Sequence, residues 1–398
     1  MTALRHASFR ELPRTDDRAP RVLERCGPRQ PLPPVASPDP RAFHASLPGY
    51  RQTPLTELPR LAQALGLERI WVKDESERFG LPAFKVLGAS WAAFLMLCER
   101  FDLEPAQQRW PFVELAAAAR AHGTQLVAAT DGNHGRALAY AARLFGCTCT
   151  ILVPAGTADA RIEAIAGEGA VVEVCDGSYD DAIAAAAALA DERRVVVSDT
   201  SWEGYHRIPQ WVSDGYSTIF RELDAQLGDL GERPDVVFVQ TGVGALAAAV
   251  IRHFAASGGP ENPHVVVVEP LTAACALAAA EVGGPALVPG PHPSVMAGLN
   301  CGAVSPLAAP LLDAAVSAYC AISDELAEEA VRILAAEGVE AGETGAAGLA
   351  GLLALHRSAP DALGGAGAGW RRALVIVTEG VTDPVTHARA LAAGGQTR

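Results

Sequence analysis

QLVAATDGNHGRALAYAARLF, residues 125–145, is the stretch of sequence that decides the fold. Its first six residues, Gln125–Thr130, form a short and mostly apolar run, which is typical of a buried strand. Asp131 and Gly132 then make a turn, and the Ala-rich run that follows predicts a helix over His134–Phe145. A strand, a glycine turn and a helix in this order form the repeating unit of a parallel α/β sheet.

The same alternation continues through the chain from Thr53 onward. Further short runs rich in Val or Ile predict buried strands at Ile70–Lys73, Thr150–Val153, Val171–Val174, Val195–Ser198, Val236–Gln240, Val265–Glu269 and Leu374–Thr378. Helices are predicted between them at Lys85–Arg100, Ala158–Ala166, Asp180–Ala190, Ile208–Leu227, Ala245–Ala256 and Asp324–Glu337. We therefore expect an α/β protein with parallel sheets and helices on both faces of each sheet.

The length of 398 residues predicts two domains. Residues 1–48 are rich in proline and lack a periodic apolar pattern, which predicts an irregular N-terminal arm. We expect residues 90–195 to form a smaller α/β domain inserted into a larger one. The larger domain would then consist of residues 49–89 and 196–398.

Charge and cysteine spacing exclude several function classes. A formal net charge of −14 opposes binding to nucleic acid or to an anionic membrane surface. The eight cysteines are scattered without the C-x-x-C spacing of a zinc site, which is typical of reduced thiols and predicts no metal centre. No apolar run has the length of a membrane span or of a signal peptide, so we expect a cytoplasmic protein.

A lysine lies between apolar neighbours in the segment AFKVLGA, residues 83–89. Burial at the start of a helix is expected to lower the pKa of Lys85, which suits its amine to covalent chemistry with an aldehyde. The alternative is a surface lysine whose stem covers apolar neighbours.

Three further segments follow predicted strands, where ligands bind in open α/β sheets. Asn133 in DGNHGR carries an amide that can donate to a ring oxygen, and Gly132 and Gly135 would let the backbone approach a flat ligand. Ordinary turns and caps use the same residue types.

A glycine loop follows the Val-rich strand that ends at Gln240 and begins a helix. It consists of Gly242, Val243, Gly244 and Ala245. The loop predicts a phosphate site at the positive end of the helix dipole. Thr378 ends the last strand with a hydroxyl that can meet a pyridine nitrogen.

In this order, these four segments resemble the fold-type II pyridoxal-phosphate (PLP) enzymes, the tryptophan-synthase-β-like group. Within that group the chain is similar to the family of diaminopropionate ammonia-lyases. The similarity lies in TDGNHGR at 130–136, DTSWEGY at 199–205, MAGLNCG at 296–302 and TEGVTDP at 378–384. It extends from about Tyr50 to His387.

The resemblance implies a role for each of these residues. Lys85 would bind the cofactor, Asn133 would face its 3′-oxygen, residues 242–245 would surround its phosphate, and Thr378 would contact its ring nitrogen. The implied reaction is elimination of the β-amino group of 2,3-diaminopropionate, a small amino acid, to give pyruvate and two molecules of ammonia. The resemblance also implies a homodimer.

Two aspartates complete the predicted catalytic set. In the resembling family, the aspartate of DGNHGR serves the D-isomer, which makes Asp131 the candidate base on the face that Lys85 does not reach. Its alternative role is a turn or helix cap. Asp199 in DTSWEGY is a candidate to bind the substrate's distal ammonium, or else a cap on its own loop.

The sequence departs from the family at Ala245, where a serine is expected in the phosphate loop, so one hydroxyl contact is lost. Other reactions therefore stay open, namely dehydration of serine or threonine and β-replacement of the cysteine-synthase kind. A PLP-binding protein without turnover is the alternative outside enzyme chemistry.

Overall fold

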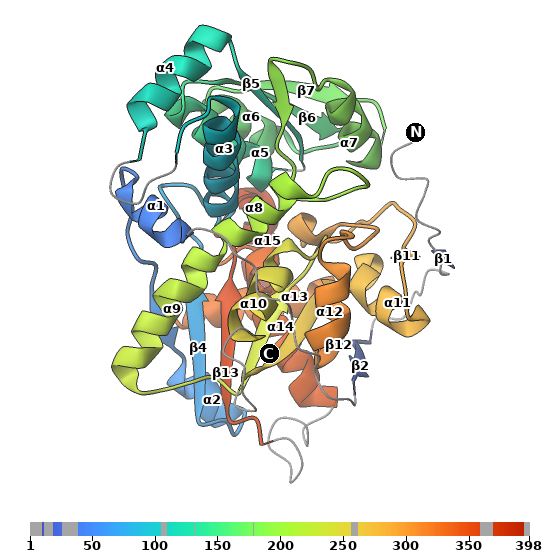
Figure 1. Ribbon diagram of the computed structural model, residues 1–398. Helices are drawn as coiled ribbons and strands as arrows, with labels where there is room; N and C mark the ends of the chain where they lie inside the picture. The colour runs from blue at the N-terminus through green and yellow to red at the C-terminus, as the bar shows by residue number, and fades with distance from the viewer. Residues whose placement is uncertain are drawn as a thin grey trace. The chain divides into compact units, whose positions relative to one another are not determined.

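The computed structural model describes residues 10–11, 19–25, 39–104, 110–130, 132–177, 179–255, 262–358 and 369–393. They form two compact units (Figure 1). The first unit includes Ser37–Arg51 and Phe79–Thr218. The second includes Gln52–Arg78 and Ile219–Arg398, together with the described residues between 10 and 25.

The sheet of the first unit has four parallel strands in the order β7-β6-β5-β8, with bounds Val171–Cys175, Thr148–Pro154, Gln125–Ala129 and Arg194–Val196. Helices α5 (Asn133–Leu144) and α7 (Tyr179–Ala188) cover its two faces. Ile151 of β6 contacts α5 at Gly135, whereas Leu152 packs against Ala182 and Ile183 of α7. Because consecutive strand residues point to opposite faces, the two helices lie on opposite sides of the sheet.

The other helices of the first unit are α1 (Pro40–Ser46), α3 (Val86–Arg100), α4 (Phe112–His122), α6 (Asp159–Gly167) and α8 (Arg207–Gly215). Helices α3 and α8 meet at two glycines. A Cβ atom on Gly88 would lie 2.5 Å from Cε1 of Tyr216, and one on Gly215 would lie 2.5 Å from the carbonyl oxygen of Leu87. The two helices therefore pack at backbone distance, directly after Lys85.

The sheet of the second unit has seven strands in the order β2-β12-β10-β9-β13-β4-β3. Their bounds are Arg21–Glu24, Ala318–Ile322, His264–Pro270, Val236–Gln240, Arg372–Val377, Arg69–Asp74 and Leu55–Glu57. The five inner strands are parallel, and β2 and β3 are antiparallel at the edges. Strands β1 (Arg10–Glu11) and β11 (Ala286–Leu287) form a separate parallel pair. Since β9 and β13 are parallel neighbours, the loops after Gln240 and Val377 begin at the same edge of the sheet.

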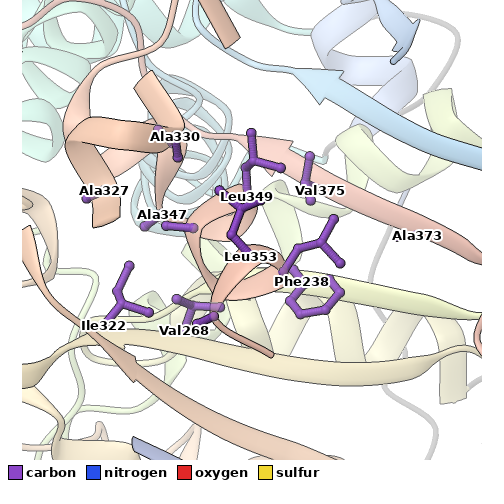
Figure 2. Close-up of a cluster of buried hydrophobic side chains, with 14 of the residues drawn as sticks. Phe238, Val268, Ile322, Ala327, Ala330, Ala347, Leu349, Leu353, Ala373 and Val375 are labelled. Carbon is purple, nitrogen blue, oxygen red and sulfur yellow. The ribbon is translucent and has the colours of Figure 1, made fainter. Parts of the chain in front are cut away.

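The described helices of the second unit are α2 (Pro59–Ala64), α9 (Ser217–Leu230), α10 (Ala245–Ala255), α11 (Cys275–Val282), α12 (Ala309–Ala315), α13 (Asp324–Ala336), α14 (Glu343–Ser358) and α15 (Pro384–Ala392), with 3-10 turns at Leu271–Ala273 and Ala297–Leu299. Helix α14 packs on one face of the sheet. Figure 2 shows its Leu349 and Leu353 against Phe238, Val268 and Val375 of the strands. These side chains are almost wholly buried and form the centre of the core.

Three glycines bring α14 close to the strands. They stand three residues apart, at 345, 348 and 351, and so share one face of the helix. A Cβ on Gly351 would lie 2.3 Å from Cγ2 of Val268, and one on Gly345 would lie 2.2 Å from the carbonyl oxygen of Glu379. Only a residue without a side chain fits at these two positions.

A buried ion network lies beside β4. The carboxylate of Glu222 accepts hydrogen bonds from Lys73 at 3.0 Å and from Arg78 at 2.7 Å. The carboxylate of Glu75 accepts one from the Arg78 guanidinium at 2.6 Å and one from the Thr53 hydroxyl at 2.5 Å. All five side chains are at most 1% exposed. Two positive and two negative groups compensate one another, which is the condition under which charges persist in a protein interior.

Glu269 is a buried carboxylate at the end of β10 that caps α11. Its two oxygens accept the backbone N–H groups of Ala276 at 2.7 Å and Leu277 at 2.9 Å. Burial raises its pKa to about 7, although these N–H groups act in the opposite direction. Between its ordinary pKa and about 7, the folded chain therefore keeps a proton on Glu269 that the unfolded chain has released.

This difference predicts how stability changes with pH. Because the folded state binds more protons in that window, the contribution of Glu269 to the free energy of unfolding should fall as pH rises from 5 to 7. The slope is about 1.4 kcal/mol per pH unit for a fully shifted group. Urea unfolding of the wild type and Glu269→Gln at pH 5, 6 and 7 measures it. The gap between the two proteins should change with pH, and a constant gap would contradict the assignment.

All eight predicted strands are present within one or two residues of their predicted ends. The predicted helix over Ile208–Leu227 is instead two helices, α8 and α9, which are separated at Tyr216. The predicted irregular arm contains regular elements in its described part. Strand β2 pairs with β12, and α1 begins with Pro40 after Asp39, whose carboxylate accepts the N–H of Arg41 at 2.9 Å.

The predicted smaller domain, residues 90–195, lies within the first unit. That unit also takes in the described residues 39–51 and extends from Phe79 to Thr218, because α1 and α8 both pack against α3. The division into two functional domains, one of residues 90–195 and the other of residues 49–89 and 196–398, stays a prediction.

Candidate functional site

Lys85 lies directly before α3 in the first unit, and its amine meets a carboxylate. Its Nζ donates a hydrogen bond to Oδ2 of Asp199 at 2.6 Å. The lysine side chain is 22% exposed and that of Asp199 is 6% exposed. The immediate neighbour of the amine is therefore an opposite charge, and the lysine side chain is partly exposed.

The Asp199 carboxylate is held in its ionised form. Burial by itself raises its pKa, but the positive charge of Lys85 and the nearby His134 together outweigh burial and lower the pKa to about 2. While it faces the charged amine of Lys85, Asp199 is therefore ionised at neutral pH. A buried permanent carboxylate of this kind is suited to receiving an ammonium group.

The turn before α5 is built around Thr130. The Thr130 hydroxyl accepts the N–H groups of Gly132 at 3.0 Å and Gly135 at 3.3 Å. A Cβ on Gly135 would lie 2.4 Å from the Thr130 methyl group, so this glycine is needed for packing inside the protein. The expectation that Gly132 and Gly135 let the backbone approach a flat ligand stays a prediction. Asn133 is half-buried at the first position of α5, while Asp131 lies outside the described residues.

The glycine loop at 242–245 lies in the second unit, between β9 and the start of α10. Gly244 has φ +97°, and a Cβ there would lie 2.7 Å from the side chain of Ala308. The loop is held by its backbone, since the carbonyl of Val243 accepts the N–H of Ser305 at 2.9 Å. The N-terminal end of an 11-residue helix and a glycine at positive φ are the parts of an anion site.

Thr241 belongs to the same loop and was not predicted. Its side chain is 2% exposed, and its hydroxyl has no hydrogen-bond partner among the described residues. An unsatisfied buried hydroxyl is costly, which indicates that a ligand or water completes it. The signal was available in the sequence, because Thr241 ends a strand as Thr378 does.

Thr378 follows β13 and is tied to the end of β9. The amide nitrogen of Gln240 lies within hydrogen-bond distance of the Thr378 hydroxyl oxygen, at 2.8 Å, and of the carbonyl oxygens of Thr344, Gly345 and Ile376, which share its two N–H groups. Four oxygens around one nitrogen fix the orientation of the amide. Since the Thr378 oxygen accepts here, its proton remains able to bond an acceptor such as an unprotonated ring nitrogen.

The predicted residues thus fall into two sets. Lys85, Asn133 and Asp199 belong to the first unit, and the structure brings the first and last of them into contact. Residues 242–245 and Thr378 belong to the second, and Gln240 links the strands that precede them. The expected convergence of the two sets on one ligand stays a prediction.

Comparison with known proteins matches residues 46–378 to the family model described as "Pyridoxal-phosphate dependent enzyme". The chain belongs to this family. Each unit of the PLP enzyme has residues of a kind that fits the cofactor: in the first unit the partly exposed side chain of Lys85, and in the second unit the loop with its unsatisfied Thr241 hydroxyl and the Thr378 hydroxyl. This PLP enzyme has the fold-type II architecture that the sequence predicts.

Several characterised relatives resemble this PLP enzyme. Diaminopropionate ammonia-lyase of Escherichia coli (strain K12) is 37% identical over 295 residues, which cover 74% of this chain and 73% of that protein. A biosynthetic L-threonine dehydratase of Haemophilus influenzae is 30% identical over 240 residues, or 58% of this chain and 39% of that protein.

Solved structures give the same relation. The Escherichia coli diaminopropionate ammonia-lyase in complex with D-serine matches with a TM-score of 0.86 and 34% identity, over 94% of this chain and 97% of that one. The present protein is accordingly a PLP-dependent carbon–nitrogen lyase that acts by β-elimination. None of the described helices has the length and apolar character needed to cross a membrane.

Proposed function

We propose that this chain is a diaminopropionate ammonia-lyase, which converts 2,3-diaminopropionate and water to pyruvate and two molecules of ammonia. The observation that carries the proposal is the contact between Lys85 and Asp199, 2.6 Å apart in the first unit. This contact brings together an amine, which can bind the cofactor and take the Cα proton, and a carboxylate, which can bind the substrate's second ammonium. The 37% identity to the Escherichia coli enzyme of that name supports the choice of substrate.

The chain offers two lysine side chains, at positions 73 and 85. Lys73 is fully buried, and its amine bonds to the Thr53 carbonyl, Glu222 and Gln226. Lys85 is therefore the lysine we assign to the cofactor. Reduction of the holoenzyme with borohydride, followed by peptide mass mapping, should place the cofactor on Lys85.

We extend the proposal to the remaining contacts with the cofactor. We assign Asn133 to the 3′-oxygen and Thr378 to the ring nitrogen. Gly242, Val243, Gly244 and Ala245 would hold the phosphate at the start of α10. Thr241 would add its buried hydroxyl there and so replace the contact that Ala245 cannot make.

When bound, PLP supplies an electron sink that stabilises negative charge at the substrate's Cα. Lys85 removes the Cα proton of one isomer with its amine. Lys85 must be an uncharged amine to take this proton, so at that stage Asp199 does not face a lysine ammonium and can receive the substrate's β-ammonium. That group leaves as ammonia with the electrons of its bond to Cβ. Hydrolysis of the remaining enamine then yields pyruvate and the second ammonia.

An assay of ammonia and pyruvate with both isomers of diaminopropionate tests the proposal. Two molecules of ammonia per pyruvate are expected. Serine, threonine and O-acetylserine belong in the same assay, because a relative named threonine dehydratase is 30% identical to this chain. Pyruvate or oxobutyrate from the hydroxy amino acids alone would replace the proposed substrate. Formation of cysteine from O-acetylserine and added sulfide would indicate β-replacement instead.

We propose Asp131 as the base for the D-isomer, on the family resemblance of the DGNHGR segment. Asp131→Asn should lower kcat on D-diaminopropionate by about 10²-fold or more, while the L-isomer loses much less. Steady-state kinetics on the two isomers measures the difference. Equal losses would assign Asp131 a structural or general protonation role.

The remaining predictions concern the whole enzyme. We propose the functional domain division at residues 90–195, a homodimer and a cytoplasmic location. Light scattering of the purified holoenzyme tests the dimer, which a monomer mass would contradict.

A further inference from the structure

The loop that carries Asp199, residues 196–205, is closed by its own last side chain. The hydroxyl of Tyr205 donates to the carbonyl of Val196 at 2.9 Å and accepts the N–H of Ser198 at 3.0 Å. One hydroxyl thus fixes backbone groups on both sides of Val197, just before Asp199. We call residues 196–205 the Asp199 loop.

Val197, between Val196 and Ser198, is bonded to a side chain of another element. The carbonyl of Val197 accepts a hydrogen bond from Nε2 of His134, on α5, at 2.7 Å. Residues 196, 197 and 198 therefore each have a backbone group bonded to the side chain of Tyr205 or His134. The position of the next residue, Asp199, follows from these bonds.

The Tyr205 ring is itself fixed in place. It stacks on Trp202 with centroids 4.0 Å apart and planes at 13°, and the two residues also pair through their backbones. Burial raises the pKa of Tyr205 well above its ordinary value, so the hydroxyl keeps its proton and both of its bonds at neutral pH. A rigid neutral phenol is a suitable support for a charged group.

We infer that Tyr205 is a positioning residue, which sets the Asp199 carboxylate at the point where it receives an ammonium. The inference rests on the proposed function, because it takes the substrate's β-ammonium as the group that is received. A contact of 2.6 Å between Asp199 and the Lys85 amine leaves little tolerance in the position of the carboxylate. Tyr205 should therefore govern recognition of amino acids that carry a second ammonium.

Tyr205→Phe tests this role, because it removes both hydroxyl bonds and keeps the ring stack. Spectroscopic titration of the holoenzyme should show the apparent Kd for diaminopropionate raised about tenfold, and that for serine changed less than twofold. Serine is the discriminating ligand because it has no side-chain ammonium. Hydrogen exchange of the peptide covering residues 196–205 should become faster.

Tyr319→Phe is the matched control, since it removes from the second unit a buried hydroxyl that donates to the carbonyl of Leu312 at 3.1 Å. It should leave both ligands unaffected. Ser198→Ala is a milder change in the same loop, because it removes the acceptor of the Thr200 N–H at 3.2 Å. It should give a smaller loss in the same direction, and it decides the question if Tyr205→Phe does not fold.

The outcomes separate the two proposals. Equal weakening of both ligands, or unchanged exchange in the Asp199 loop, would overturn the role of Tyr205. Asp199→Asn should show the same selectivity for diaminopropionate. If it does not, or if the wild type does not turn over diaminopropionate, the proposed function fails whatever Tyr205 does.

Discussion

Lys85→Ala should abolish the release of pyruvate and ammonia, with a loss of more than about 10³-fold in kcat. The amine is expected to do two things, to hold the cofactor covalently and to take the Cα proton, so no residual pathway of similar rate is available. The absorption band of the lysine-bound cofactor should disappear with the activity. Lys73, fully buried and bonded to Glu222, cannot replace it without breaking the ion network.

The control for this variant is Lys85→Arg. A guanidinium can keep the charge pair with Asp199 but cannot form the same covalent bond. It should retain the unfolding midpoint of the wild type in urea and still lack the absorption band. Turnover at the wild-type rate in either variant would exclude Lys85 from the reaction.

Glu222→Leu should have the largest effect on stability, a loss of about 3–5 kcal/mol in the free energy of unfolding. It removes the carboxylate shared by Lys73 and Arg78 and leaves one uncompensated positive charge in a site that is at most 1% exposed. Urea unfolding followed by circular dichroism measures the shift. Glu329→Gln is the comparison, because its pair with Arg357 lies at the surface and should cost less than about 1 kcal/mol.

A second change can separate charge from packing. Adding Lys73→Met to Glu222→Leu restores a neutral cluster of Glu75 and Arg78. The double variant should be more stable than Glu222→Leu alone, since the buried excess charge is gone. A double variant that is less stable, by the sum of the two single effects, would show that packing dominates at this site.

The strands were predictable because each is a short Val-rich run, and such a run is typical of a strand that is buried on both faces of a parallel sheet. Helix α14 was not predicted, since three glycines oppose helix formation in isolation and only packing on the sheet compensates. Strand β12, AYCAI, was missed because it is short and has a single β-branched residue. Helix α1 was hidden by the prolines around it, although Pro40 fits the first turn of a helix.

The candidate site was predictable where a residue's type limits its chemistry. Lys85, Asp199 and Thr378 follow from their position after strands and from the family pattern. The contact between Lys85 and Asp199, 114 residues apart in the chain, could not be read from sequence. Gln240, Thr241 and Tyr205 were missed because a buried polar group reveals its role only through its neighbours.

The crossing of α3 and α8 restricts how this protein can vary. At Gly88 and Gly215 even a methyl group would overlap atoms of the opposing segment, and Lys85 lies directly before the first turn of α3. The placement of the reactive amine therefore depends on two glycines, for which no larger residue can substitute. A lineage altering its substrate range would have to leave this crossing untouched and change the loops instead.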